Sequence, residues 1–189
     1  MVFPSCFVLG IRVLVTVLLL WPEWLLLALL IVAALYDHAQ RRVPNPLVLA
    51  MLPAGALAAI WPGVLNWLDL FHWGLSGRPE SLALTLAANA VAAGAVAGLL
   101  VAIEAVWRRV RGSAGLGMGD VKLLFALMLA SPTRGLTSFA VALVLLAIVG
   151  AVTHRRSLPL VPFILPGWAL FSLVSWVSLF QWYESLMPG

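Results

Sequence analysis

Long apolar runs, separated by short clusters of charged residues, proline and glycine, make up most of the 189-residue chain. A helix needs roughly 20 mostly apolar residues to cross the hydrocarbon core of a bilayer. The runs are continuous and rich in Leu and Ala, whereas the strands of a membrane barrel alternate in polarity over about ten residues. The pattern therefore predicts an all-α, polytopic membrane helical bundle. The seven predicted segments are 4–20, 22–36, 46–62, 82–107, 120–132, 136–152 and 160–182.

The first run differs from the others because Arg12 interrupts it and Pro22 with Glu23 separates it from the second run. A hairpin of two short helices and a single kinked helix both fit this pattern. Tryptophan is enriched at membrane interfaces, so Trp21 and Trp24 on either side of the break favour the hairpin. We therefore expect an extra N-terminal hydrophobic segment before a six-helix core. The predicted domains are 1–21 for the segment and 22–189 for the membrane domain.

The composition excludes a soluble globular domain. Hydrophobic residues make up 63% of the chain and charged residues 10%, against about 45–50% and 25% in ordinary soluble domains. The net charge of +4 is therefore attributed to cytoplasmic loops, and we expect a lipid environment and no nucleic-acid partner. The single cysteine permits no internal disulfide, and the three histidines share no metal-ligand spacing, so we expect no metal and no cofactor.

Basic residues give the orientation of the bundle. When the loops after the second run are placed alternately on the two sides, eight basic residues fall on one side and two on the other. By the positive-inside rule the first side is cytoplasmic, which predicts a multi-pass protein of the cytoplasmic (inner) membrane. The fifth run would span only about 20 Å, so we expect its cytoplasmic end to begin below the membrane surface. The eight residues are Arg41, Arg42, Arg108, Arg109, Arg111, Lys122, Arg155 and Arg156, and the other two are Arg78 and Arg134.

Two carboxylates are the candidates for chemistry, because an ionisable residue in a membrane segment costs on the order of 2.5–3.5 kcal/mol and needs a reason. Glu104 can pair with Arg108 four residues later, which accounts for it structurally. Asp37 and Asp120 remain, and the predicted topology places both at cytoplasmic helix ends. Two adjacent carboxylates do not readily both ionise, so one keeps a proton while the other acts as a base, as in an aspartyl protease.

The segment before Asp120 supports this hypothesis and also allows a structural one. Gly117 and Gly119 permit a close, irregular backbone where an extended substrate can lie, and a helix beginning there would favour the ionised form of Asp120. An Asp before a helix is also a common N-cap. Likewise, Asp37 can pair with Arg41 at the four-residue spacing. Because the two Asp residues share a face, the catalytic hypothesis is the better one.

Other polar and small residues have structural interpretations. Pro44 ends the incoming chain, and Asn45 suits an N-cap position. Lys122 either extends to the membrane surface or interacts with the Asp pair, and we favour the first. Asn89, inside the fourth run, is expected to bond a neighbouring helix. A stripe of small residues is expected to let another helix approach closely, and its members are Ala90, Gly94 and Gly98.

Three ordered segments resemble the type IV prepilin peptidases, which are membrane aspartyl proteases of the GxGD type (peptidase family A24). Residues 37–45, Asp-His-Ala-Gln-Arg-Arg-Val-Pro-Asn, are similar to the family's Asp, basic residues and hydrophobic-Pro-Asn turn. Residues 117–122, Gly-Met-Gly-Asp-Val-Lys, match GxGD with its following Lys. Residues 158–167 resemble the proline-rich opening of the family's last helix. Together these segments cover the chain from about residue 22 to its end.

The resemblance implies that the chain removes the short basic leader of prepilins at the cytoplasmic membrane face, with Asp37 and Asp120 as the catalytic pair. It assigns supporting roles to the residues around them. Full-length members also methylate the new N-terminus and carry a cytoplasmic domain with two cysteine pairs. This chain shows no such domain, which argues against methyltransfer and makes it similar to the short members that serve Flp/Tad pili. The supporting residues are Gly117, Gly119, Lys122, Pro44 and Asn45.

A proton- or ion-coupled transporter using the same two carboxylates is the alternative. Transport requires polar groups along a path to the outer face. The runs offer few beyond Asn89 and scattered Ser and Thr residues, so the peptidase is the preferred prediction.

Overall fold

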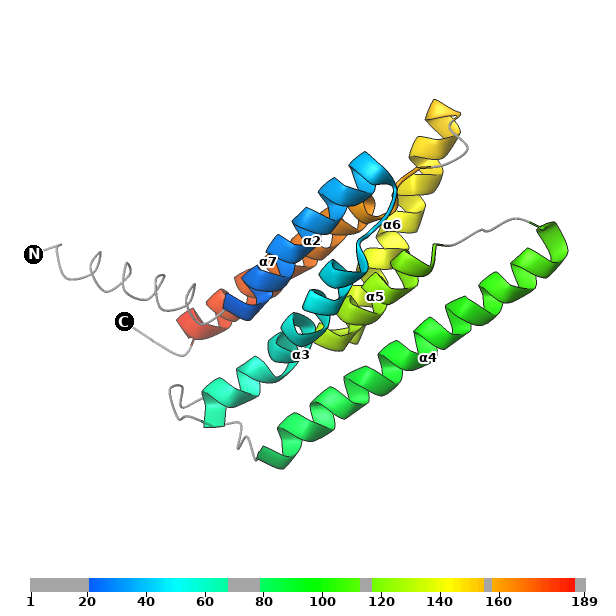
Figure 1. Cartoon of the computed structure of the whole chain (residues 1–189). Coiled ribbons are helices and arrows are strands. Elements are labelled where there is room, and N and C mark those ends of the chain that lie inside the picture. Colours follow the sequence, from blue (N-terminus) through cyan, green and yellow to red (C-terminus); the bar gives the residue numbers. More distant parts are fainter. Residues whose placement is uncertain (1–20, 68–78, 113–116, 155–157, 186–189) are drawn as a thin grey trace, which may run out of the picture.

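The computed structural model describes residues 21–67, 79–112, 117–154 and 158–185. The predicted N-terminal hydrophobic segment lies outside these residues. Six α-helices and no strand make up the described chain (Figure 1). They are α2 (Trp21–Gln40), α3 (Asn45–Trp67), α4 (Pro79–Arg111), α5 (Met118–Ala130), α6 (Pro132–Thr153) and α7 (Val161–Ser185).

The helices confirm the predicted helical membrane bundle. Each of the six apolar runs from the second onward corresponds to one helix, and four helices are long and apolar enough to cross a membrane. The largest difference in bounds is in α4, which has 33 residues and extends beyond the expected run at both ends. At about 1.5 Å per residue it is about 50 Å long, well beyond a hydrocarbon core of about 30 Å. The four spanning segments are Trp21–Gln40, Asn45–Pro62, Leu82–Arg111 and Pro132–Thr153.

The short helix α5 is the most buried part of the bundle. It packs against α3, α4 and α6, while α2 packs against α3 and α7, and α6 against α7. A helix that is apolar on nearly all sides is typical of one buried in a protein core or a membrane, and apart from Asp120 and Lys122 the residues of α5 are apolar or small. The other helices therefore enclose α5 and fix the position of its first turn. Its buried residues are Val121, Leu123, Leu124, Ala126, Leu127, Met128 and Leu129.

Glycine allows two close approaches to α5. A Cβ atom added at Gly55 of α3 would lie 2.5 Å from the carbonyl oxygen of Ala126, so the two helix backbones touch there. A Cβ atom added at Gly135 of α6 would lie 2.8 Å from Cγ of Met128, beside the sharp α5–α6 connection at Ser131. Both contacts require the absence of a side chain, which lets α3 and α6 lie directly on α5.

The expected packing role of the small-residue stripe on α4 is wrong within this chain. Gly94 and Gly98 are exposed, and nothing outside α4 lies within 4 Å of a Cβ atom added at either one. Ala93 is fully buried instead, and Asn89 bonds α5. The face of α4 that packs on the bundle is therefore rotated away from the stripe.

The last turns of α2, α4 and α6 and the first turns of α3, α5 and α7 lie at the same end of the bundle (Figure 1). Successive loops are expected from the sequence to lie on alternate sides of the membrane, which also puts the three connections between these turns on one side. The described basic residues Arg41, Arg42, Arg108, Arg109 and Arg111 are at this end. One end of the bundle is therefore strongly basic.

We expect Gly55→Ala to lower the stability of the bundle by about 1–3 kcal/mol, because the new methyl group forces α3 away from α5. Thermal unfolding in detergent micelles measures this effect. Gly94→Ala is the matched control: it gives the same gain in helix propensity, about 1 kcal/mol, and meets no neighbour. Equal melting temperatures for the two variants would contradict the close approach at Gly55.

Candidate active site

Asp37 lies in the last turn of α2, and its side chain is buried, with 6% of its surface exposed. The backbone N–H of Arg41 donates to the carbonyl of Asp37 at 2.9 Å, and Arg41 has a φ of 53°, so the helix ends directly after this turn. The carboxyl oxygen Oδ2 of Asp37 accepts a hydrogen bond of 3.0 Å from the backbone N–H of Val161, the first residue of α7. The end of α2 and the start of α7 therefore meet at this carboxyl group.

Asp120 is the third residue of α5 and is partly buried. The N-cap of α5 is Gly117, whose backbone is extended, and no side chain caps the helix. The structural alternative, in which Asp120 is the N-cap residue, therefore does not hold. Its carboxyl group instead takes a backbone hydrogen bond from Gly117, which satisfies a donor at the helix start as in one half of a capping box.

The pKa of Asp120 is raised from 3.8 to about 6, chiefly by burial and secondly by the nearby Asp37 carboxylate, while the backbone hydrogen bond from Gly117 lowers it. Asp120 belongs to none of the four membrane-spanning segments. The helix start favours the ionised form through the backbone hydrogen bond from Gly117, as expected, but desolvation and a like charge outweigh it. Two carboxyl groups from α2 and α5 thus interact electrostatically at one end of the bundle.

The two glycines before Asp120 have different roles. A Cβ atom added at Gly117 would lie 2.9 Å from Oδ2 of Asp120, so this glycine makes room for the carboxyl group. Gly119 lies inside the first turn of α5, where an added Cβ atom would meet only Val43, at an ordinary 3.9 Å. The expected irregular backbone at Gly119 is therefore absent. The steric requirement falls on Gly117.

Two residues of the sequence motifs are joined across the site. Nζ of Lys122 donates to Oδ1 of Asn45 at 3.3 Å, which links α5 to the start of α3. The predicted N-cap role of Asn45 is wrong, since the carbonyl of Pro44 accepts the first helical hydrogen bonds from Leu47 and Val48. The Asn45 side chain is thus available for Lys122, a partner that the sequence did not indicate.

Two predicted structural contacts are confirmed. Nδ2 of Asn89 donates to the carbonyl of Leu129 at 3.0 Å and ties α4 to α5. Nε of Arg108 lies 2.7 Å from Oε1 of Glu104, in the pair expected from their spacing. The first contact joins α4 to α5, whereas the second lies within α4.

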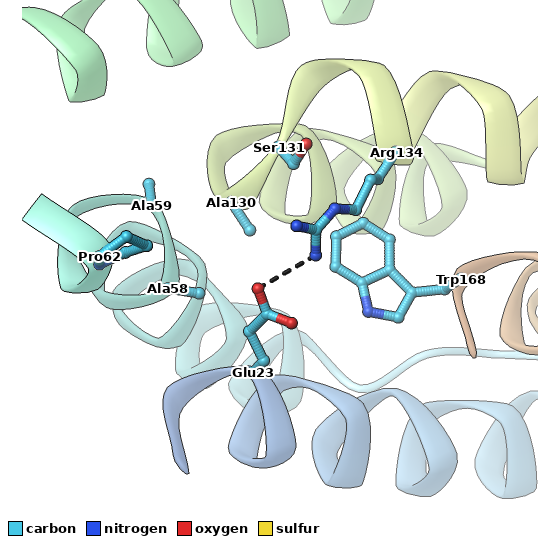
Figure 2. A pocket seen from close by; sticks show the side chains of 8 residues that line it. All are labelled: Glu23, Ala58, Ala59, Pro62, Ala130, Ser131, Arg134 and Trp168. Atoms are coloured by element: carbon cyan, nitrogen blue, oxygen red, sulfur yellow. Dashed lines mark hydrogen bonds and ion pairs between the residues drawn. The ribbon is translucent and has the colours of Figure 1, made fainter. Parts of the chain in front are cut away.

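A second polar cluster lies at the opposite end of α2, in a cavity of about 130 Å³ (Figure 2). Nη1 of Arg134 donates to Oε1 of Glu23 at 3.0 Å, and the Trp168 ring lies beside them. This pair joins the first turns of α2 and α6. Sequence reasoning missed it because the two residues are far apart in the chain and were assigned to separate outer loops.

The described residues contain no group of three or more His, Cys, Asp or Glu side chains that could hold a metal ion. One protonated and one ionised carboxyl group can donate and accept a proton across a substrate placed between them.

The fold and the pair define a class, that of helical integral membrane proteins with two interacting carboxyl groups at one end of the bundle. The sequence profile of the type IV leader peptidase family matches residues 24–154, which is more than half of the chain. The chain belongs to this family and is a type IV leader peptidase in the general sense, with a prepilin as the implied substrate. Comparisons with curated proteins and with solved structures find no match.

We expect the Asp120 carboxyl group to titrate near pH 6 in the intact protein, as followed by the carboxyl ¹³C shift of labelled aspartate in micelles. Asp37→Asn removes the like charge and should lower the pKa of Asp120. The pKa should stay above 3.8, because burial is the larger cause. Glu23→Gln, at the other end of α2, should leave the titration unchanged. An unchanged midpoint in Asp37→Asn would show that the two groups do not interact.

Proposed function

We propose that this chain is an aspartyl endopeptidase that removes the basic leader peptide of type IV prepilins, with Asp37 and Asp120 as its catalytic residues. One observation carries the proposal: α2 and α5 bring two carboxyl groups to the same end of the bundle, where burial and the charge of Asp37 raise the pKa of Asp120. Perturbed carboxyl groups of this kind are typical of sites that transfer protons. The match to the leader peptidase family supports the substrate class.

The reaction needs no group beyond the two carboxyls and water. The ionised carboxylate takes a proton from water as the water oxygen attacks the scissile carbonyl carbon. The protonated carboxyl gives its proton to the carbonyl oxygen. Gly117 leaves room beside Asp120, and Lys122 with Asn45 holds α5 to α3, so these residues are proposed to support the site. Pro44 and Gly119 are also proposed to support the site.

The catalytic end of the bundle is proposed to face the cytoplasm. Arginines cluster there, in the connection after α2 and in the last turn of α4. At the other end, the described Arg134 is paired with Glu23. Cytoplasmic loops carry the excess of Lys and Arg in membrane proteins. A basic leader held in the cytoplasm would reach the Asp pair from this side.

The proposed substrates are Flp-type prepilins, because the chain resembles the short peptidases of Flp/Tad systems. In this proposal residues 22–189 form the catalytic membrane domain and residues 1–21 an additional hydrophobic segment. The family match favours peptidase activity over a proton- or ion-coupled transporter that uses the same pair.

We expect Asp37→Asn and Asp120→Asn each to reduce leader removal at least about 100-fold, since each variant lacks a group that accepts or donates a proton in the reaction. The assay co-expresses the chain with an Flp-type prepilin and follows the mobility of the pilin.

Glu23→Gln is the matched control, since it makes the same carboxyl-to-amide change in α2 at the far end of the bundle. It should retain leader removal at equal membrane abundance. Normal processing by either Asp variant would reject the proposed catalytic pair.

The proposed orientation predicts a labelling pattern for the two ends of α4. In a Cys6→Ser background, Glu80→Cys should react with an impermeant maleimide added outside spheroplasts, and Arg111→Cys should react only after permeabilisation. Because α4 is about 50 Å long, both ends extend beyond the hydrocarbon core. The reverse pattern would place the Asp pair on the outer face.

A further inference from the structure

The first turn of α7 leaves a single backbone donor without a partner inside the helix. The N–H groups of Phe163 and Ile164 both donate to the carbonyl of Leu160, at 3.0 and 3.3 Å. Pro162 has no N–H to donate. Among the first three residues of α7, only the N–H of Val161 is therefore free to bond another element.

Asp37 takes this one donor. Oδ2 of Asp37 lies 3.0 Å from the nitrogen of Val161, although the two residues are 124 positions apart in the chain. Both residues are buried, so water does not compete for the bond. An N–H group donates more strongly to an ionised carboxylate than to a neutral carboxyl group. The start of a helix also carries a partial positive charge.

The other titratable groups closest to Asp37 along the chain are Tyr36 and His38 on α2 and Arg41, which directly follows α2. On α5 the titratable groups are Asp120 and Lys122. The described side chains of α3 and α7, the two helices packed against α2, include no titratable group. Lys122 donates to Asn45. The contribution of α7 to Asp37 is therefore the Val161 N–H alone.

Resting on the proposed peptidase function, we infer that the Val161 amide holds Asp37 as the ionised carboxylate, so that Asp37 is the general base and Asp120 the general acid. Val161 is a positioning residue in this account, because its amide bonds Asp37 and not the substrate. It occupies Oδ2 and leaves Oδ1 of Asp37 for the attacking water. The raised pKa of Asp120 agrees with its role as the acid.

The assignment balances the reaction. Asp37 takes a proton from water as the new carbon–oxygen bond forms, and Asp120 gives its proton to the carbonyl oxygen, which yields a neutral gem-diol. Asp37 then gives its proton to the amide nitrogen as the carbon–nitrogen bond breaks. A gem-diol hydroxyl proton returns to Asp120. The products are a carboxylic acid and an amine, and both Asp residues regain their starting states.

A pair of variants at one position tests the inference. Val161→Pro removes the N–H, and proline is well tolerated at the first position of a helix. An N-cap residue such as Leu160 normally has extended dihedral angles, which also suit the residue before a proline. Val161→Ala trims the same side chain but keeps the N–H. Both variants are purified in micelles and assayed on a prepilin peptide across pH.

We expect the midpoint of the acid limb of the kcat–pH profile to lie about one pH unit higher in Val161→Pro than in Val161→Ala, with KM unchanged. The direction follows because the lost bond had stabilised the charged form of the base. The alkaline limb, set by Asp120, should keep its midpoint. Coincident profiles for the two variants, or a uniform loss of activity at every pH, would overturn the assignment.

Pro162→Ala provides a second test, including when Val161→Pro fails to accumulate. It adds an N–H at the residue after Val161, in the same helix end, and should shift the acid limb to lower pH. An unmoved limb in this variant would also overturn the assignment. If the parent chain does not cleave the peptide, the proposed function fails together with the inference. A cleaving parent with unmoved limbs rejects the inference alone.

Discussion

Two carboxyl groups that lie close together in an apolar bundle repel each other when both are ionised, and this repulsion organises the proposed site. This repulsion is the second cause of the raised pKa of Asp120, and burial is the larger one. The bundle holds the groups together because α5 is buried among α3, α4 and α6, which fixes its first turn near the end of α2. The apolar packing of α5 therefore determines the electrostatics of the Asp pair.

The motif residues around the pair act mainly through the backbone and through space. Gly117 is required because a side chain there would meet the Asp120 carboxyl group. Pro162 leaves Val161 as the free donor at the start of α7. Lys122 bonds Asn45 and not an Asp residue. Because these contacts come from α3, α5 and α7, a local change in one helix is expected to alter the protonation of the whole site.

The sequence was sufficient to predict the helices and the end of the bundle at which both Asp residues lie. Apolar runs bounded by charge define membrane helices, and the alternation of loops places helix ends on one side or the other. Apart from the bond of Asn89 to a neighbouring helix, the contacts between helices were not predictable, because they depend on how each helix is rotated and how deeply it lies. The exposed Gly94 and Gly98 illustrate this, as does the Glu23–Arg134 pair. Uniformly apolar helices such as α5 carry almost no pattern that fixes rotation.

Chemical cross-linking between positions 37 and 120 tests the central claim most directly. In a Cys6→Ser background, Asp37→Cys with Asp120→Cys should be joined within one chain by a short bifunctional thiol reagent in native membranes, as detected by mass spectrometry. Asp37→Cys with Glu104→Cys, whose second position lies on α4, should remain unlinked. Absence of the first cross-link at full reactivity of both thiols would contradict a site built from these two residues.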